Sequence, residues 1–202
     1  MSGLSKFGVP VDNTTTSVLM PKLQYRFRVT FNNIGGKSAT KALTHQVVSV
    51  TRPTLTHEEI TLDVYNSKIF LAGKHSWEAI TLVIRDDVDN TVIALIDAQM
   101  QNQIDHHEQS APLAGAQYKF TTVIDTLDGR NDKTLGPSVL DKWTLAGCWI
   151  SSAAFNESNY ATSDAMAINL TVRYDNASHQ TGLGTNLLSG QSIDPTLLSA
   201  TG

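Results

Sequence analysis

The chain has 202 residues and a mass of 21.9 kDa, and 41% of its residues are apolar and 17% charged. This length predicts one domain that buries a core without needing a disulfide or a structural metal. The net charge of -4 and a pI near 5.8 argue against a basic nucleic-acid reader. The charged fraction is below the usual share of about 25%, which indicates that sister subunits cover part of the surface.

The cysteine count and the hydropathy of the chain exclude further classes. Cys148 is the single cysteine, so an intrachain disulfide and a CxxC site are ruled out. Its apolar neighbours predict a buried thiol rather than a nucleophile. No apolar run approaches the roughly 20 residues of a membrane span, and residues 1–13 lack the apolar stretch of a signal peptide. We therefore expect no membrane anchor and a protein that is made and kept in the cytoplasm.

Alternating apolar and polar residues predict that most of the chain forms β-strands. Residues 1–20 have no sustained period and are interpreted as an N-terminal arm. A domain is expected over 21–176, and the Gly-, Ser-, Thr- and Asn-rich segment 177–202 is expected to be a C-terminal extension, flexible or ordered by a partner. The strands expected in chain order are 24–31, 45–51, 59–66 continuing extended through 67–71, 76–85, 117–127, 142–151 and 166–174.

One segment has a helical period instead. Its apolar residues form a single stripe and predict a helix near 90–106, with Asp89 or Asn90 as the N-cap. The stripe consists of Val92, Ile93, Leu95, Ile96, Met100 and Ile104. Because strands and helices do not alternate as βαβ units, we expect a mainly β protein. The expected architecture is an antiparallel β-barrel or sandwich of about seven strands with one packed α-helix.

The search for catalytic, cofactor and metal sites is negative. His106 and His107 are adjacent, and adjacent helical residues point about 100° apart, so they cannot chelate one ion from a helix. Segment 128–132 has an arginine where a calcium loop needs a ligand. Segment 182–184 lacks the third glycine of a dinucleotide-binding loop, and the chain has no Gly-x-Ser-x-Gly. We expect a protein that is not an enzyme and holds neither a cofactor nor a metal.

Long strands with open edges predict self-association. Segment 59–71 is extended and has no proline to block its edges. A monomer would blunt such edges. Joining them between subunits would instead close a barrel made of several chains.

The order of short motifs along the chain resembles that of a known family. From Tyr65 to Val83 a basic residue and an extended apolar run lead to Ala-Gly, followed by the aromatic Trp77 and an alternating strand that ends in Asp86-Asp87. A helix, a late strand at 143–150 and a final alternating strand at 165–175 follow. This order is similar to that of the tail tube proteins of contractile-tailed bacteriophages, whose fold is shared by the Hcp proteins of type VI secretion. The resemblance spans about 23–175 and leaves out the loop 129–137.

The resemblance implies a mechanical function in the virion tail. Six copies would form a ring, with strands from each copy joined into an inner barrel, and rings would stack into a tube. A contracting sheath would drive the tube through the host envelope, and DNA would pass along the lumen without specific binding. The implied partners are further copies of the chain and the sheath, baseplate and tail-terminator proteins. Assembly would take place in the host cytoplasm.

Two alternatives within the fold stay open, an Hcp-like secretion tube and the tube-initiator ring of a baseplate. A third alternative belongs to another class, namely a β-sandwich module that binds a carbohydrate or a receptor. A platform of exposed Trp or Tyr side chains would favour that module. Most aromatic residues here lie on the apolar faces of the expected strands, which favours a core.

Two sets of site residues follow from the open edges, the strand alternation and the family. The first set is expected to contact the neighbouring ring and consists of Glu59, Tyr65, Lys68, Ile69 and Phe70. The second set contains the polar alternates of the inner strands and is expected to face the lumen. It consists of Asp63, Thr81, Thr121 and Asp125. Because side chains alternate along a strand, each error of one residue in register would invert the face.

Overall fold

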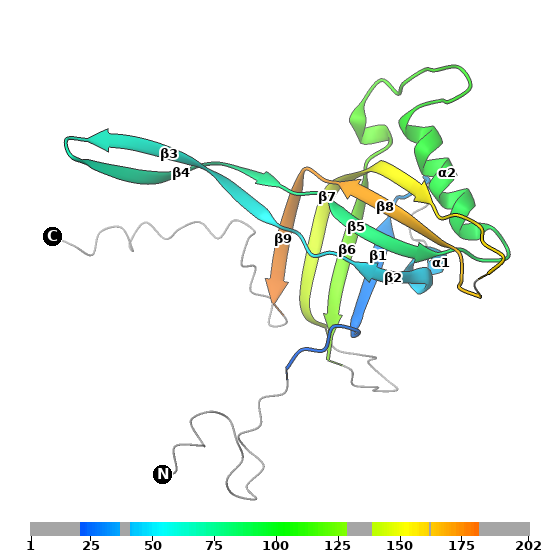
Figure 1. Ribbon diagram of the computed structural model, residues 1–202. Coiled ribbons are helices and arrows are strands. Elements are labelled where there is room, and N and C mark those ends of the chain that lie inside the picture. Colours follow the sequence, from blue (N-terminus) through cyan, green and yellow to red (C-terminus); the bar gives the residue numbers. More distant parts are fainter. Residues whose placement is uncertain (1–20, 37–40, 129–138, 162, 182–202) are drawn as a thin grey trace, which may run out of the picture.

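Two groups of antiparallel strands, joined by one long strand, build the body of the protein (Figure 1). The computed structural model describes residues 21–36, 41–128, 139–161 and 163–181. Neighbouring strands follow the order β1-β6-β7-β8-β5-β2, and β9 also pairs with β7. The strands of this seven-stranded sheet are β1 (Phe27–Asn32), β2 (Val47–Val50), β5 (Ile80–Arg85), β6 (Phe120–Leu127), β7 (Val139–Phe155), β8 (Ala167–Arg173) and β9 (Asn176–Thr181).

Strand β7 belongs to both groups because it is 17 residues long. It pairs with β9 up to Ala146 and with β8 from Trp149 onward. Gly147 lies between these two parts with φ +72°, a left-handed conformation that glycine adopts at no steric cost. A Cβ at this position would overlap the Asp175 carboxylate. Gly147 therefore marks the point where the strand passes from one group to the other.

The apolar sides of both groups contribute to one buried core. The alternation read from the sequence places the correct residues there, and each is at most 4% exposed. Val29, Phe31, Ile124 and Leu145 come from the first group, and Ile80, Leu82, Ile84, Leu170 and Val172 come from the second. The expected mainly β architecture, an antiparallel sheet with a packed helix, is confirmed.

Helix α2 (Thr91–Gln103) packs on this core through Val92, Leu95 and Ile96, which are buried. The helix is shorter than the predicted 90–106, and Asn90 occupies the N-cap position, as predicted. Asn90 adopts a left-handed conformation and its side chain makes no capping bond. The Asp87 carboxylate caps the helix instead, because it accepts bonds from the Thr91 hydroxyl and, at 3.2 Å, from the Val92 N–H. The bond from Thr91 is the main cause that lowers the pKa of Asp87.

Three further elements differ from the sequence prediction. A short helix, α1 (Lys41–Gln46), occupies the start of the expected strand 45–51, and its Leu43 is buried in the core. The first strand begins at Phe27 rather than residue 24, because a turn between Leu23 and Arg26 precedes it. Strand β9 carries the sheet to Thr181, into the segment expected to be an extension. A single 3-10 turn, η2 (Gly115–Gln117), precedes β6.

The expected continuous strand 59–71 is in fact a hairpin. Among the described strands, β3 (Leu55–Val64) and β4 (Ser67–Trp77) pair only with each other, and they project away from the body (Figure 1). The chain reverses at Tyr65, whose φ is +51°. Within the described residues, no helix has the length and apolar character needed to cross a membrane.

Replacing Gly147 with alanine tests the role of the turn within β7. The variant must hold a Cβ at positive φ, which costs about 1–2 kcal/mol, and must also displace Asp175. Gly36→Ala is the matched control, because Gly36 has φ +74° and a Cβ added there would meet no atom within 4 Å. We expect Gly147→Ala to lower the free energy of unfolding by about 1 kcal/mol more than Gly36→Ala does. Equal losses in urea titrations would show that the contact with Asp175 is unimportant.

Candidate assembly surfaces

The two faces of the β3–β4 hairpin differ in character, and one of them is apolar. Its register pairs Ile60 with Leu71 and Leu62 with Ile69, and directly paired residues share a face. The apolar face consists of Ile60, Leu62, Val64, Ile69 and Leu71, each between 45% and 48% exposed. A two-stranded hairpin is marginally stable by itself in water, and a contiguous exposed apolar patch marks an interaction surface. This face is therefore the strongest candidate for a contact with another chain.

All five residues predicted to contact a neighbouring ring lie on this hairpin. Ile69 belongs to the apolar face, whereas Glu59, Lys68 and Phe70 lie on the opposite face, and Tyr65 occupies the turn with 98% of its side chain exposed. Asp63, which was predicted to face the lumen, is also here. Its carboxylate lies 3.8 Å from the Lys68 ammonium in an exposed ion pair.

A cluster of aromatic rings attaches the root of the hairpin to the body. Trp77, at the end of β4, makes an edge contact with Trp143 of β7 at 6.5 Å between ring centroids and lies 5.9 Å from Tyr174. Trp143 in turn stacks on His179 of β9 at 4.3 Å. Burial raises the pKa of Tyr174 to about 12. The root is thus packed on the body while the distal half of the hairpin extends into solvent (Figure 1).

The outer side of strands β1, β6, β7 and β9 forms a second candidate surface, called here the polar face. Its members are the alternates of the core residues, and the strand register aligns them in rows. Neutral polar side chains predominate among them. The members are Arg28, Thr30, Asn32, Thr121, Val123, Asp125, Lys142, Thr144, Ala146, Asn176, Ser178 and Gln180.

Of the four residues predicted to face the lumen, the structure brings two together on this polar face. Thr121 and Asp125 lie on the same side of β6, whereas Thr81 is exposed on β5 in the other group of strands and Asp63 is on the hairpin. Asp125 is only 3% exposed. Its carboxylate accepts bonds from the Arg28 guanidinium at 2.7 and 3.2 Å. It is therefore a buried member of an ion pair rather than a free acid on the surface.

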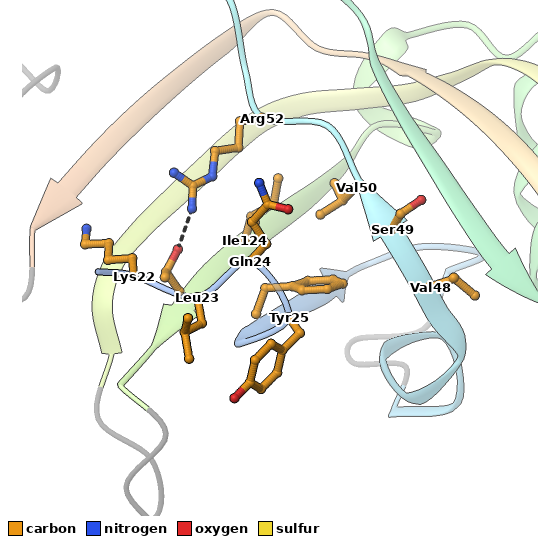
Figure 2. A pocket seen from close by; sticks show the side chains of 11 residues that line it. Lys22, Leu23, Gln24, Tyr25, Val48, Ser49, Val50, Arg52 and Ile124 are labelled. Atoms are coloured by element: carbon orange, nitrogen blue, oxygen red, sulfur yellow. Dashed lines mark hydrogen bonds between the residues drawn. The ribbon is translucent and has the colours of Figure 1, made fainter. Parts of the chain in front are cut away.

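A groove opens between the segment that leads into β1 and strand β2 (Figure 2). It has a volume of about 760 Å³ and a mixed lining of six apolar or aromatic and five polar or charged residues, with Lys22 and Arg52 at one end. Lys22 forms an ion pair at 2.6 Å with Asp141, which is buried. Burial opposes ionisation of Asp141, but Lys22, Thr126 and Arg52 together outweigh it and lower the pKa of this carboxyl.

Other residues with chemical potential stay apart. His107 and Glu108 donate backbone bonds to Asp105 in an exposed turn, and those bonds lower the pKa of Asp105. Cys148 is buried, and burial raises the pKa of its thiol. In the part of the chain that the structure describes, no three His, Cys, Asp or Glu side chains gather as metal ligands. The expected turn at 128–132 and the 182–184 segment lie mostly or wholly outside the described residues.

No family model matches the sequence, and no curated protein matches it. Solved structures do match. A chain of the anti-feeding prophage tube-terminating cap has a TM-score of 0.62 and 16% identity over 86% of this chain and 99% of that one. A chain of the six-fold symmetrised anti-feeding prophage baseplate has a TM-score of 0.58 and 15% identity over 81% and 98%. The SPP1 tail tube has a TM-score of 0.53 and 11% identity over 80% of each chain. The chain has the tail-tube fold. The family resemblance read from the sequence is thereby confirmed at the level of the fold.

Breaking the Lys22–Asp141 pair tests its contribution to the stability of the tail-tube fold. Because the pKa of Asp141 is lowered in the folded chain, its stabilisation is present above the unfolded pKa and is lost as the pH falls through the folded pKa. Lys22→Met leaves a buried carboxylate with less compensation and raises that pKa. We expect a loss of about 1–2 kcal/mol at pH 7, since Lys22 is half exposed, and an acid limb of the stability curve that begins at higher pH.

Urea titrations of the unassembled chain between pH 3 and pH 7 measure both effects. Lys68→Met is the matched control, because the side chains of its ion pair with Asp63 are 63% and 80% exposed. We expect that control to change stability by less than about 0.5 kcal/mol. If both variants behave alike at every pH, the ion pair at Asp141 is not a stabilising feature.

Proposed function

We propose that the protein is the subunit of a contractile tail tube. Six copies form a ring, and rings stack into a hollow tube that conducts DNA into a host cell. The observation that carries this proposal is the hairpin, which holds five half-exposed apolar side chains clear of a body with the tail-tube fold. A monomer would leave this face in water, whereas a stack of rings would bury it.

The ring wall is formed by strands β1, β6, β7 and β9 of each copy. Among the described strands, β1 and β9 are the two edges of this group, and a sheet edge can pair with a strand of another chain. Pairing β1 of one copy with β9 of the next makes the sheet continuous around the ring, and closure removes the edges. The buried core side then faces outward and the polar face lines the channel.

The chemistry of the polar face supports a conduit for DNA. Duplex DNA carries one phosphate charge per about 1.7 Å of axis, and each phosphate contact to Lys or Arg adds a salt-dependent grip. The row that contains charge holds Arg28, Asp125 and Lys142, with Asp125 bonded to Arg28, so this row carries one net positive charge per copy. The next row is neutral, and consists of Thr30, Val123, Thr144 and Ser178. Outside the charged row, the members of this face carry no charge that would hold a polyanion.

The same architecture supports the proposal that this protein is part of a virion tail. Its partners would then be other structural proteins of that tail. The structures with the same fold come from a baseplate, a tube-terminating cap and a tail tube. A sheath outside the tube, a baseplate at one end and a terminator at the other are the corresponding partners of this chain. Assembly takes place in the host cytoplasm.

The tube-initiator ring of a baseplate is a second candidate function, because one of the compared structures with this fold is a baseplate chain. The carbohydrate- or receptor-binding module is less favoured. Trp77 and Trp143 pack at the root of the hairpin, and the exposed Tyr25, Tyr65 and Tyr160 lie on separate elements rather than on one platform.

Charging the apolar face tests the stacking of rings. Ile69→Asp places a carboxylate where assembly would bury it without a partner, which is strongly unfavourable. We expect a folded chain with unchanged far-UV circular dichroism and no tubes in sedimentation or electron microscopy. Val88→Asp is the matched control, because Val88 is 100% exposed and lies outside the hairpin. Tubes of normal length from Ile69→Asp would contradict the proposed ring contact.

Adding positive charge to the polar face tests the DNA conduit. We expect Thr121→Lys combined with Thr144→Lys to permit tube assembly and to reduce DNA delivery by about tenfold or more, because phosphate contacts repeat in every ring. Thr81→Lys controls for charge alone, since Thr81 is exposed on the other group of strands. Unaltered delivery by particles that carry both lysines would argue for a cargo other than DNA.

A further inference from the structure

We infer that the groove between residues 22–25 and β2 receives the β3–β4 hairpin of a copy in the adjacent ring. This inference rests on the proposed stacking of rings and adds the surface on which the hairpin docks. The hairpin supplies an apolar face that nothing covers within the described part of its own chain. The groove supplies the apolar surface that this face lacks.

The groove is open, six of its eleven lining side chains are apolar or aromatic, and both of its walls contain exposed side chains. Figure 2 shows Leu23 and Tyr25 along one side and Val48 and Val50 of β2 along the other, with Ile124 between them. Tyr25 is 71% and Val48 is 43% exposed. These values are high for side chains that line a concave apolar surface, and they mark positions that a partner can cover.

One wall of the groove and one row of the hairpin's apolar face cover the same number of residues. From Val48 to Arg52 an extended chain spans about 13 Å, and the apolar row from Ile60 to Val64 spans the same about 13 Å, since each covers four residue steps. The row of Ile60, Leu62 and Val64 can therefore lie along the whole wall formed by β2 and the residues that follow it.

Charge complementarity fixes which strand of the hairpin lies beside the basic end of the groove. Lys22 and Arg52 stand at that end, and because Asp141 is paired with Lys22, one net positive charge is left there. Strand β3 contains Glu58, Glu59 and Asp63 and no Lys or Arg, whereas β4 contains Lys68 and Lys74. The acidic strand β3 therefore lies nearest to Lys22 and Arg52, with Glu59 and Asp63 on the face of the hairpin that is turned away from the groove.

The hairpin and the groove of one chain do not meet. The distal half of the hairpin points away from the body, and the groove opens beside the residues that lead into β1 (Figure 1). A contact between two different surfaces of identical chains is head-to-tail, and it propagates when it does not close on itself. The groove also lies on the core side of β1, so the outer edge of that strand stays available for the neighbour within the ring.

Chemical cross-linking in assembled tubes tests the docking. The double variant Leu62→Cys with Val48→Cys is treated with a short bis-maleimide and run on a denaturing gel. Each copy then links its hairpin to one neighbour and its groove to another, so we expect a ladder of dimers, trimers and higher species. Leu62→Cys with Val88→Cys is the matched control and is expected to give no ladder. The native Cys148 is buried and does not react.

Further outcomes test whether the groove is the acceptor of the hairpin, independently of whether the protein forms tubes. An absent ladder in the Val48 variant, or an equal one in the Val88 control, overturns the docking. Val48→Asp is expected to stay folded and to lose stacking. Normal tubes from Val48→Asp, together with none from Ile69→Asp, overturn the groove as acceptor while the tube function stands. Protection of a lone Val48→Cys thiol from maleimide in the unassembled chain would overturn it too, because another segment of the same chain would then fill the groove.

Discussion

Continuity of β7 through Gly147 is the constraint on which the rest of the structure depends. One strand supplies a pairing partner to β6 and β9 in its first part and to β8 in its second. The two groups of strands therefore enclose a single core rather than forming separate sheets. The same geometry turns the polar alternates of β1, β6, β7 and β9 away from the core, and within the described part of the chain it leaves β1 and β9 as edges. Ring closure and a polar channel wall both follow from this arrangement.

The apolar face of the hairpin is a second constraint, because the described part of its own chain does not cover it. Its root is held by the packing of Trp77 against Trp143 and Tyr174, which fixes the direction in which the hairpin leaves the body. Beyond the root, β3 and β4 pair with each other and with no other described strand. Contact with another copy would compensate for the exposed apolar surface. Assembly would then order the hairpin as well as hold the rings together.

The sequence predicts those parts of the fold that depend on periodicity. Alternation identified the core faces of β5 and β8, and the helical stripe identified α2. The reversal at Tyr65 has only a weak sequence signal, Asn66, because neither Gly nor Pro marks that turn. Strand β9 has a polar composition typical of a tail, and its pairing with β7 decides its conformation. Helix α1 is short, and burial of Leu43 rather than helical period determines it.

The candidate sites divide in the same way. Burial and pairing of Asp125 depend on Arg28, 97 positions away in the sequence, and no local pattern indicates that contact. Separation of Thr81 from Thr121 depends on the division of the sheet into two groups. The inter-ring set was easier to place on one element, since all five residues lie within one extended segment. The groove combines segments before β1, in β2 and in β6, so only the folded chain brings it together.

Electron cryo-microscopy of the purified, unmodified protein tests the central claim most directly. The account predicts hollow tubes of stacked six-fold rings, with density for the β3–β4 hairpin bridging from each ring to the next. Dispersed monomers whose hairpins lie in solvent would contradict it. So would tubes in which the hairpin makes no contact with the adjacent ring.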